Sequence, residues 1–357
     1  MSYFHLNLIL KGKLTVCCLL MLPAIPLNAQ REAKQIGDFK ESISLNEHLR
    51  GTKRTLQYRP DGDEFVCVNG KNRYTRALYG SHSPFRVETS DRPVFAFYNN
   101  GRGGNISFKV ILRDGTELAL DCTGHCESRY SAGKRTYYLT DPSWGKGELR
   151  ISVLALADMD GAIWRFSPSN MPKGAILRWQ HGGATGKRLS RNGDMGVDPA
   201  DCFELPVEAT DLVTGELPLQ KEVYLVRGEV PEDYNVRKLY QQAEAASLAL
   251  ASHLKIETPD PYLNTLGGAL VAAADGIWDG QVWLHGAIGW RMPLSGWRAG
   301  YTGDALGWHD RARTHFDAYA ASQVTDVPNT IPHPVQDSTM NLARSEKRWG
   351  TPQYSNG

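Results

Sequence analysis

The chain has 357 residues, 41% of them hydrophobic, which is enough for two domains of ordinary size. It carries 40 lysines and arginines against 39 aspartates and glutamates, a formal net charge of +1. Because phosphate binding relies on a basic excess, this balance argues against nucleic acid as the main partner.

The first 29 residues have the pattern of a secretory signal peptide. Lys11 and Lys13 precede an apolar run that ends at Ile25, and a small-residue cleavage pattern ends at Ala29. The run of about 12 residues is shorter than the roughly 20 needed to span a bilayer. We therefore expect residues 1–29 to be removed, leaving a secreted or periplasmic protein that does not contact the membrane.

The next segment, residues 30–230, is predicted to form an antiparallel β-sandwich of roughly ten strands. Its short runs are rich in β-branched and aromatic residues, namely TLQY, EFVCVN, PVFAFY, ISFKVILR, ELALD, RTYYLT, ELRISVLALA, AIWRFS, AILRWQ and KEVYLVRG. Dipeptides that accept positive φ at tight turns separate these runs, among them Asp61-Gly62, Asn69-Gly70, Asn100-Gly101, Asp114-Gly115, Asp160-Gly161 and Asn192-Gly193.

Four cysteines follow the expected cleavage site, and an exported protein can pair them: Cys67, Cys122, Cys126 and Cys202. A bridge between Cys122 and Cys126 would be the simplest, although four cysteines allow three connectivities. A zinc site using His125 would need further ligands at suitable spacing, which the sequence lacks. Disulfides or free thiols are therefore favoured over a metal site.

Helical periodicity begins after Pro231. Apolar residues at steps of three and four predict a linker helix within residues 231–258, whose apolar side should lie against the sandwich. These residues are Val236, Leu239, Tyr240, Ala243, Ala246, Leu250 and Leu254.

Residues 259–357 are predicted to begin a second, helical domain. Asp260 and Pro261 provide a cap and a first-turn proline for a helix with Leu266, Leu270 and Ala274 on its apolar side. Thr302 or Asp304 would cap a third helix, with an apolar side of Ala305, Trp308, Ala312, Phe316 and Tyr319. From residue 322 on, repeated prolines indicate extended loop.

Tryptophan is concentrated near the start of this helical part. Five of the nine tryptophans lie between residues 278 and 308, interleaved with arginine, histidine and aspartate. Indole rings offer apolar faces to sugar rings, and the charged neighbours offer hydrogen bonds to hydroxyl groups. The candidate substrate-binding residues are Trp290, Arg291, Trp297, Arg298, Tyr301, Trp308 and His309, with His285 as a further polar anchor. The alternatives are a tryptophan-rich helical core and structural ion pairs, such as Arg298 with Asp304.

Two blocks resemble a known family. AIWRFSPSNMPKGAILRWQHGGATGKRLSRNGDMGVDPADCFELP and TPDPYLNTLGGALVAAADGIWDGQVWLHGAIGWRMPLSGWRAGYTGDALGWHDRARTHF are similar to secreted proteins of Gram-negative polysaccharide degraders that carry domain of unknown function 4450 and look like six-hairpin glycosidases. The resemblance covers about residues 50–357. It implies a β-sandwich followed by an (α/α)6 toroid, with carbohydrate as substrate. A complete toroid needs several hundred residues, so we expect this chain to be an N-terminal fragment with an incomplete toroid.

Glycosidic bond cleavage normally uses one protonated and one ionised carboxyl group. Asp304 is a candidate base or hydroxyl acceptor, because an aspartate at a helix start is favoured in its ionised form; its alternative role is a helix cap. Asp310 would lie about 240° away around the same helix, which argues against a shared role. Asp275 and Asp279 flank Trp278 and are equally consistent with loop caps. The sequence thus leaves the catalytic acid and base unassigned.

These observations predict a secreted glycoside hydrolase-like protein that acts on a polysaccharide or oligosaccharide by acid/base hydrolysis. The alternatives are a non-catalytic carbohydrate-binding protein, and a polysaccharide lyase that uses Tyr301 with Arg298. No cofactor is expected. Asp158 and Asp160 fit turn chemistry, whereas a cluster of aspartates at positions 194, 198 and 201 remains a candidate for structural calcium, although its spacing is not that of a calcium-binding helix-loop-helix.

Overall fold

A computed structural model describes residues 57–99, 102–188, 212–284 and 296–321. The chain divides into a unit of residues 1–56 and a unit of residues 57–357, and all described residues belong to the second. The predicted signal peptide, Cys202 and the aspartate cluster at 194–201 lie outside the described residues. No helix in the described part is long and apolar enough to cross a membrane.

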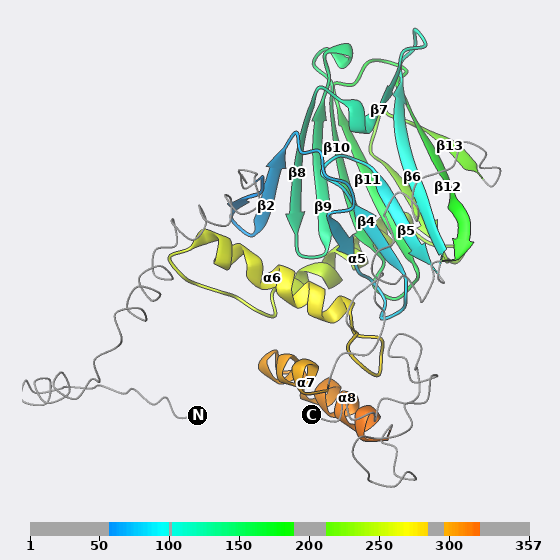
Figure 1. Cartoon of the computed structure of the whole chain (residues 1–357). Coiled ribbons are helices and arrows are strands. Elements are labelled where there is room, and N and C mark those ends of the chain that lie inside the picture. The colour runs from blue at the N-terminus through cyan, green and yellow to red at the C-terminus, as the bar shows by residue number, and fades with distance from the viewer. Residues whose placement is uncertain (1–56, 100–101, 189–211, 285–295, 322–357) are drawn as a thin grey trace, which may run out of the picture. The chain divides into compact units, whose positions relative to one another are not determined.

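Two antiparallel sheets form a sandwich-like body (Figure 1). Sheet 1 contains, in spatial order, β1 (Arg59–Asp61), β2 (Glu64–Val68), β8 (His125–Ser131), β9 (Lys134–Thr140), β10 (Glu148–Ala155), β11 (Gly161–Ser169) and β14 (Val223–Gly228). Sheet 2 contains β13 (Val213–Pro218), β12 (Ile176–Arg188), β6 (Arg102–Ile111), β5 (Phe95–Asn99), β4 (Arg86–Thr89) and β3 (Arg76–Leu78), and β7 (Glu117–Ala119) pairs with β6. Two short 3-10 helices, η1 (Leu120–Cys122) and η2 (Pro142–Trp144), lie in connections. The predicted antiparallel sandwich is confirmed at this level.

Alternating side chains of the two sheets form the main core. Leu149, Ile151 and Val153 point inward from β10 and have no exposed surface. Trp164 of β11 lies among phenylalanines of sheet 2, with ring centroids 5.6 Å from Phe95 in an edge-on arrangement. Burying such side chains stabilises the fold by roughly 1.5–3 kcal/mol each.

Five described strands, β1, β3, β4, β8 and β13, have no counterpart among the predicted runs. The reason is clearest in β8, whose sequence HCESRYS contains few apolar residues. Its burial nevertheless alternates, since Cys126, Ser128 and Tyr130 are buried. Small polar residues and thiols therefore occupy inward positions, and apolar content alone does not reveal the strand.

The predicted turns at two dipeptides are confirmed. Gly62 has a φ of 60° between β1 and β2, and Gly115 has a φ of 86° between β6 and β7. Both positions require the left-handed backbone that glycine adopts without steric cost.

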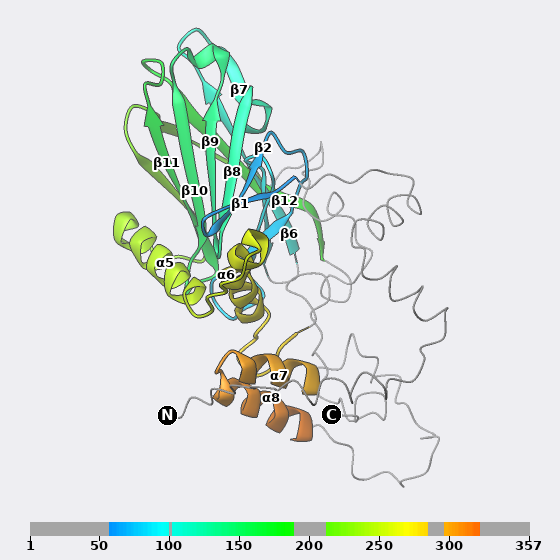
Figure 2. The ribbon, with the colours of Figure 1, turned by 90° about the vertical axis from the view of Figure 1, so that its left-hand side faces the viewer.

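The predicted linker helix is α5 (Val236–Ala251). Its N-cap residue Asn235 accepts a hydrogen bond from the backbone N–H of Lys238 at 3.0 Å. Leu239, Tyr240 and Ala243 pack against outward-facing apolar residues of sheet 1. Figure 2 shows α5 beside β10 and β11, so the helix covers part of one face of the sandwich as expected.

Helix α6 (Pro261–Gly276) begins where the sequence predicts, because the Asp260 carboxylate accepts from the Tyr262 N–H at 2.8 Å. Its predicted apolar side is wrong in part, since Leu270 is 47% exposed. The side of α6 that packs against the protein instead carries glycines, among them Gly267 and Gly268. A Cβ at Gly268 would lie 3.1 Å from a backbone oxygen of α5, so the small residues allow close packing on that side.

The predicted third helix is instead two helices, α7 (Gly296–Ala305) and α8 (His309–Ala321). Gly307 has a φ of 73°, which interrupts the helical path. Asp304 consequently lies in the last turn of α7 and is not an N-cap. The described helices leave the predicted toroid untested.

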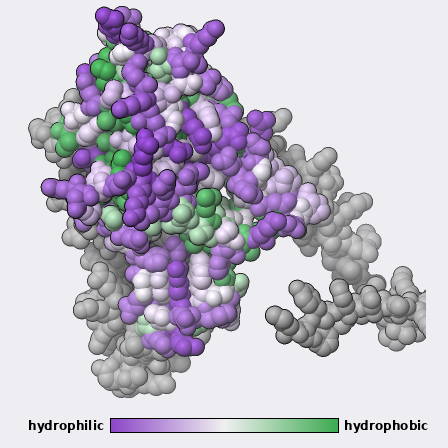
Figure 3. Space-filling view, turned by 180° about the vertical axis from the view of Figure 1, so that it is seen from behind, coloured by the Kyte–Doolittle hydropathy of each residue, from purple (hydrophilic) through white to green (hydrophobic). Residues whose placement is uncertain are grey.

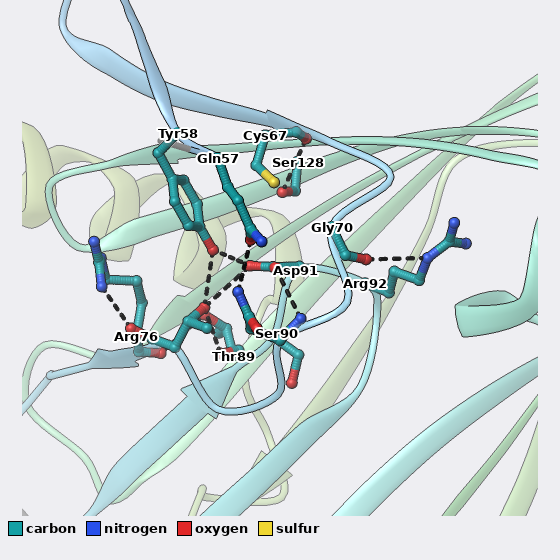
Figure 4. A network of polar contacts seen from close by, with 12 residues as sticks. Gln57, Tyr58, Cys67, Gly70, Arg76, Thr89, Ser90, Asp91, Arg92 and Ser128 are labelled. Atoms are coloured by element: carbon teal, nitrogen blue, oxygen red, sulfur yellow. Dashed lines mark hydrogen bonds between the residues drawn. The ribbon is translucent and has the colours of Figure 1, made fainter. Parts of the chain in front are cut away.

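A buried polar network stands near one edge of the sandwich (Figure 4). The Asp91 carboxylate accepts from the Tyr58 hydroxyl and from the Asn72 N–H at 2.9 Å. Its Oδ1 lies 3.6 Å from the guanidinium of Arg135, and neither side chain is exposed. These contacts hold the loop between β2 and β3 against the inner face of sheet 1.

Of the two alternatives for the cysteines, the structure has free thiols at Cys67, Cys122 and Cys126, so the simplest bridge, Cys122 with Cys126, does not form. Cys122 is exposed at the end of η1, whereas Cys126 points into the core and its thiol donates to the Asp91 carbonyl at 3.6 Å. The alternation of β8 determines this inward orientation.

Candidate functional site

The predicted sugar-binding residues have different positions in the structure. Trp290, Arg291 and His285 lie outside the described residues. Trp297 and Arg298 lie in the first turn of α7, and their side chains are also outside the description. Tyr301, further along the same helix, is 67% exposed.

Two other tryptophans of the cluster belong to a core. Trp278 and Trp283 are buried, with ring centroids 4.6 Å apart. The Trp283 indole N–H donates to the Ala274 carbonyl at 3.0 Å. The helical-core alternative therefore applies to these two rings.

Trp308 is partly buried at the start of α8. Its ring stacks on His253 with centroids 5.3 Å apart, and the Arg311 guanidinium lies 4.6 Å from the ring centroid. The ring thus has protein contacts, and its role as a sugar platform stays a prediction.

Asp304 and His309 form an exposed pair, with 2.9 Å between the carboxylate and Nδ1. The argument that a helix start favours ionised Asp304 is wrong, because the residue is at the opposite end of its helix, where the dipole is negative. Asp310 lies in the first turn of α8 and is exposed. The exposure of both aspartates and the single ion pair of Asp304 give no indication of a catalytic role for either residue.

A more constrained carboxylate is Asp275, at the end of α6. It is 8% exposed, and its Oδ1 accepts from Arg311 at 2.7 Å and lies 3.1 Å from the His82 Nε2. Burial would raise the pKa of Asp275, but hydrogen bonds from His82 and Arg311 outweigh it, and the pKa is lowered. Among the described residues, no donor contacts Oδ2. Asp275 is therefore an ionised carboxylate with one oxygen available.

Asp275 borders a cavity of about 200 Å³. Tyr79 and His82 line it from the loop between β3 and β4, while Ala243 and Ala246 line it from α5. The cavity thus combines small apolar residues with a few polar groups, as small-molecule sites do.

Glu88 of β4 does not line this cavity, but its charge acts on Tyr79, which does. The Arg86 guanidinium lies 4.9 Å from the Tyr79 ring centroid and donates to the Gly276 carbonyl at the end of α6. Burial raises the pKa of Glu88 to about 7, against the lowering effect of Arg86. About half of the Glu88 carboxyl groups are therefore protonated at neutral pH.

Sequence reasoning missed Glu88 and His82. The only local signal for Glu88 is a pair of charged residues, Arg86 and Glu88, that alternate along the short strand RVET and so share one side of it. For His82 the sequence offers no signal, because its partner Asp275 is 193 positions away.

Metal binding is not indicated by the described residues, which contain no group of three or more histidine, cysteine, aspartate or glutamate side chains placed to hold an ion. Asp160 accepts from the Ser81 hydroxyl at 2.7 Å, which fits a role in the turn. The aspartates at 194, 198 and 201 lie outside the description, so the calcium candidate is untested.

Residues 100–229 match the model of a family described as a domain of unknown function, DUF4450. The matched segment runs from β6 to β14 and so contributes strands to both sheets. No curated protein matches the chain. Glu88 and Asp275 both lie outside the matched segment, so their roles have to be argued from the site itself.

Proposed function

We propose that this protein is a secreted, carbohydrate-active protein of the glycoside hydrolase type. Its sandwich would precede the first helices of an (α/α)6 toroid, and its substrate would be a polysaccharide or oligosaccharide. The signal-peptide pattern, the two sequence blocks similar to six-hairpin glycosidases and the sandwich-like fold support this proposal.

The observation that carries it is a pair of carboxyl groups whose pKa values are displaced in opposite directions around Tyr79. Glu88 has its pKa raised to about 7, while the pKa of Asp275 is lowered. Glycosidic hydrolysis needs a proton donor for the leaving group and an ionised carboxylate to attack or to activate water. Glu88 takes the first role and Asp275 the second, in preference to Asp304 and Asp310.

The proposal is tested by reducing-sugar release from a panel of oligosaccharides. Glu88→Gln and Asp275→Asn should each lower kcat/KM by about 10²–10⁴, the usual contribution of a positioned acid or base. Asp304→Asn and Asp310→Asn serve as controls and should retain activity. Circular dichroism of each variant separates loss of catalysis from loss of folding. Undiminished turnover in the Glu88 and Asp275 variants would rule out this pair.

Binding without turnover is the second candidate function. The cavity of about 200 Å³ is smaller than the roughly 300–1,000 Å³ typical of ligand pockets, which favours a single sugar ring over a longer substrate. If the wild-type protein binds saccharides but releases no reducing sugar, binding without turnover is supported and the proposed hydrolysis is ruled out.

A lyase that uses Tyr79 as its base is disfavoured. Burial raises the pKa of Tyr79 to about 12, so its hydroxyl stays protonated at neutral pH. The lyase based on Tyr301 and Arg298 remains a prediction, and absorbance of an unsaturated product near 235 nm would reveal it.

A further inference from the structure

A row of outward-facing side chains crosses sheet 1 away from the cavity at Asp275. Glu127 of β8 pairs in register with Tyr138 of β9, which pairs with Arg150 of β10. Arg150 in turn pairs with Ser167 of β11. Since residues opposite one another across strands share a face, the four side chains lie side by side on the outer surface.

This row forms part of a groove of about 520 Å³. His125, Thr140, Glu148 and Ser169 form the neighbouring row and line the same groove. The volume lies within the roughly 300–1,000 Å³ typical of small-molecule sites. Helix α5 covers a different part of the sheet, around Ile163 and Leu154.

Tyr138 provides an aromatic surface in the groove. Its side chain is 38% exposed, and the Arg150 guanidinium lies 5.3 Å from the ring centroid. The Arg129 guanidinium lies 5.9 Å from the same centroid, so two arginines hold the tyrosine on the sheet, and the exposed part of its ring is a preformed contact surface.

Arg150 differs from the neighbouring arginine in its hydrogen bonds. Arg129 donates to Glu127 at 2.6 Å and to Asp61 at 2.9 Å. Arg150 Nε, by contrast, is buried and has no acceptor among the described residues. A bound molecule cannot reach this buried Nε, so the donors that Arg150 offers to the groove are its terminal guanidinium nitrogens, which have no acceptor among the described residues.

We propose that this groove binds a neutral saccharide, with a sugar ring on Tyr138 and Arg150 donating to its oxygens. Glu127 and Glu148 accept from sugar hydroxyls. Arg129, the ion-pair partner of Glu127, also contacts Asp61 and Glu64, so together with Glu148 four carboxylates surround Arg129 and Arg150, and an acidic sugar would be repelled. This inference adopts the saccharide class of the proposed function but uses none of the residues of the Asp275 site.

The test is isothermal titration calorimetry of the whole chain with neutral gluco- and manno-oligosaccharides and with oligogalacturonate. We expect the wild type to bind at least one neutral series and to bind oligogalacturonate more weakly. Tyr138→Ala and Arg150→Met should each weaken neutral binding tenfold or more. Tyr262→Ala, a tyrosine of similar exposure on α6, and Arg178→Met on sheet 2 are matched controls that should bind as wild type.

Absence of neutral-sugar binding, preference for oligogalacturonate, or undiminished binding by both groove variants would overturn the inference. Its failure is distinguishable from failure of the proposed hydrolysis. Glu88→Gln and Asp275→Asn should leave binding at the groove unchanged, while Tyr138→Ala should leave the hydrolysis of short soluble substrates unchanged.

Discussion

The environments of individual carboxylates differ more than their sequence contexts suggest. Asp304 and Asp310 are exposed, whereas Asp91 and Asp275 are held by neighbours from distant segments, and Glu88 is desolvated beside Arg86 of the same strand. Burial without a strong donor raises the pKa of Glu88, while two donors lower that of Asp275. Each environment has a measurable consequence for stability.

Glu88 should make the protein less stable as the pH rises. Its pKa is about 7 in the folded protein against an ordinary 4.5, so the folded state retains its proton longer than the unfolded state. The stability present below about pH 4.5 is lost as the pH rises from there through about 7, by about 3 kcal/mol in all. Glu88→Gln should therefore exceed the wild type in urea midpoint at pH 8 and match it at pH 4.5.

Glu232→Gln, at an exposed position, is the control and should leave this pH difference unchanged. An equal pH response of Glu88→Gln and wild type would contradict the assigned environment.

Asp91 and Arg135 should behave as a buried pair. Asp91→Asn leaves the Arg135 charge buried without its counter-ion and should lower the free energy of unfolding by about 3 kcal/mol. The double variant Asp91→Asn/Arg135→Met removes that charge as well, so it should lose less stability than the single variant. Urea denaturation measures both, and a larger loss in the double variant would argue against this account.

At the scale of elements, single residues decide where helices end and how they pack. Gly307 separates α7 from α8, although the apolar spacing across residues 305–319 is consistent with one helix. Glycines also determine which side of α6 is buried. Helical periodicity therefore predicts the presence of helices better than their packing.

His315 of α8 should make the helical part sensitive to acid. Its Nδ1 accepts from the Trp283 N–H at 3.2 Å, and burial lowers the pKa of the ring to about 4 from an ordinary 6.5. The unfolded state takes up the proton first as the pH falls, so stability declines from about pH 6.5 to pH 4, by on the order of 3 kcal/mol. His315→Gln should flatten this decline in unfolding followed by tryptophan fluorescence.

His309→Gln, which alters an exposed histidine of the same helix, should retain the wild-type acid response. The assignment fails if the two variants respond alike.

The end of α6 should tolerate no side chain larger than that of glycine at position 276. A Cβ there would lie 2.1 Å from the ring of Tyr79. Gly276→Ala should lower the free energy of unfolding by about 1–3 kcal/mol, the usual effect of overpacking. Ala273→Ser, on an exposed part of the same helix, should stay within about 0.5 kcal/mol of the wild type in chemical denaturation. A wild-type midpoint for Gly276→Ala would show that this contact is not close in solution.

At the scale of the whole molecule, the sandwich and the helices that follow it share contacts across long sequence separations. The Thr265 hydroxyl of α6 donates to the Gly62 carbonyl in the turn between β1 and β2, at 2.8 Å. Ala269 packs against the core formed by both sheets. Hydrophilic residues dominate the face shown in Figure 3, with apolar residues scattered among them.

These contacts predict that α6 unfolds together with the sandwich. Amide hydrogen exchange under native conditions should show the buried turns of α6 protected to a degree similar to β10, because both open with the shared core. The Thr265→Ala variant loses the contact with Gly62. The Tyr262→Ala variant keeps that contact and is the control. Exchange in α6 that is orders of magnitude faster than in β10 would show that the helix opens independently.

The sequence by itself determined the local structure: an antiparallel sandwich with glycine turns, a linker helix on its surface and a second helix capped by Asp260. These features follow from short-range periodicity, capping and turn chemistry, which neighbouring residues encode. The tertiary structure alone decided which carboxylates are displaced in pKa, which tryptophans are core and which residues line the groove on sheet 1. Desolvation and charge depend on residues brought together from distant positions, such as His82 and Asp275. The local spacing of residues in the sequence does not reveal such pairs.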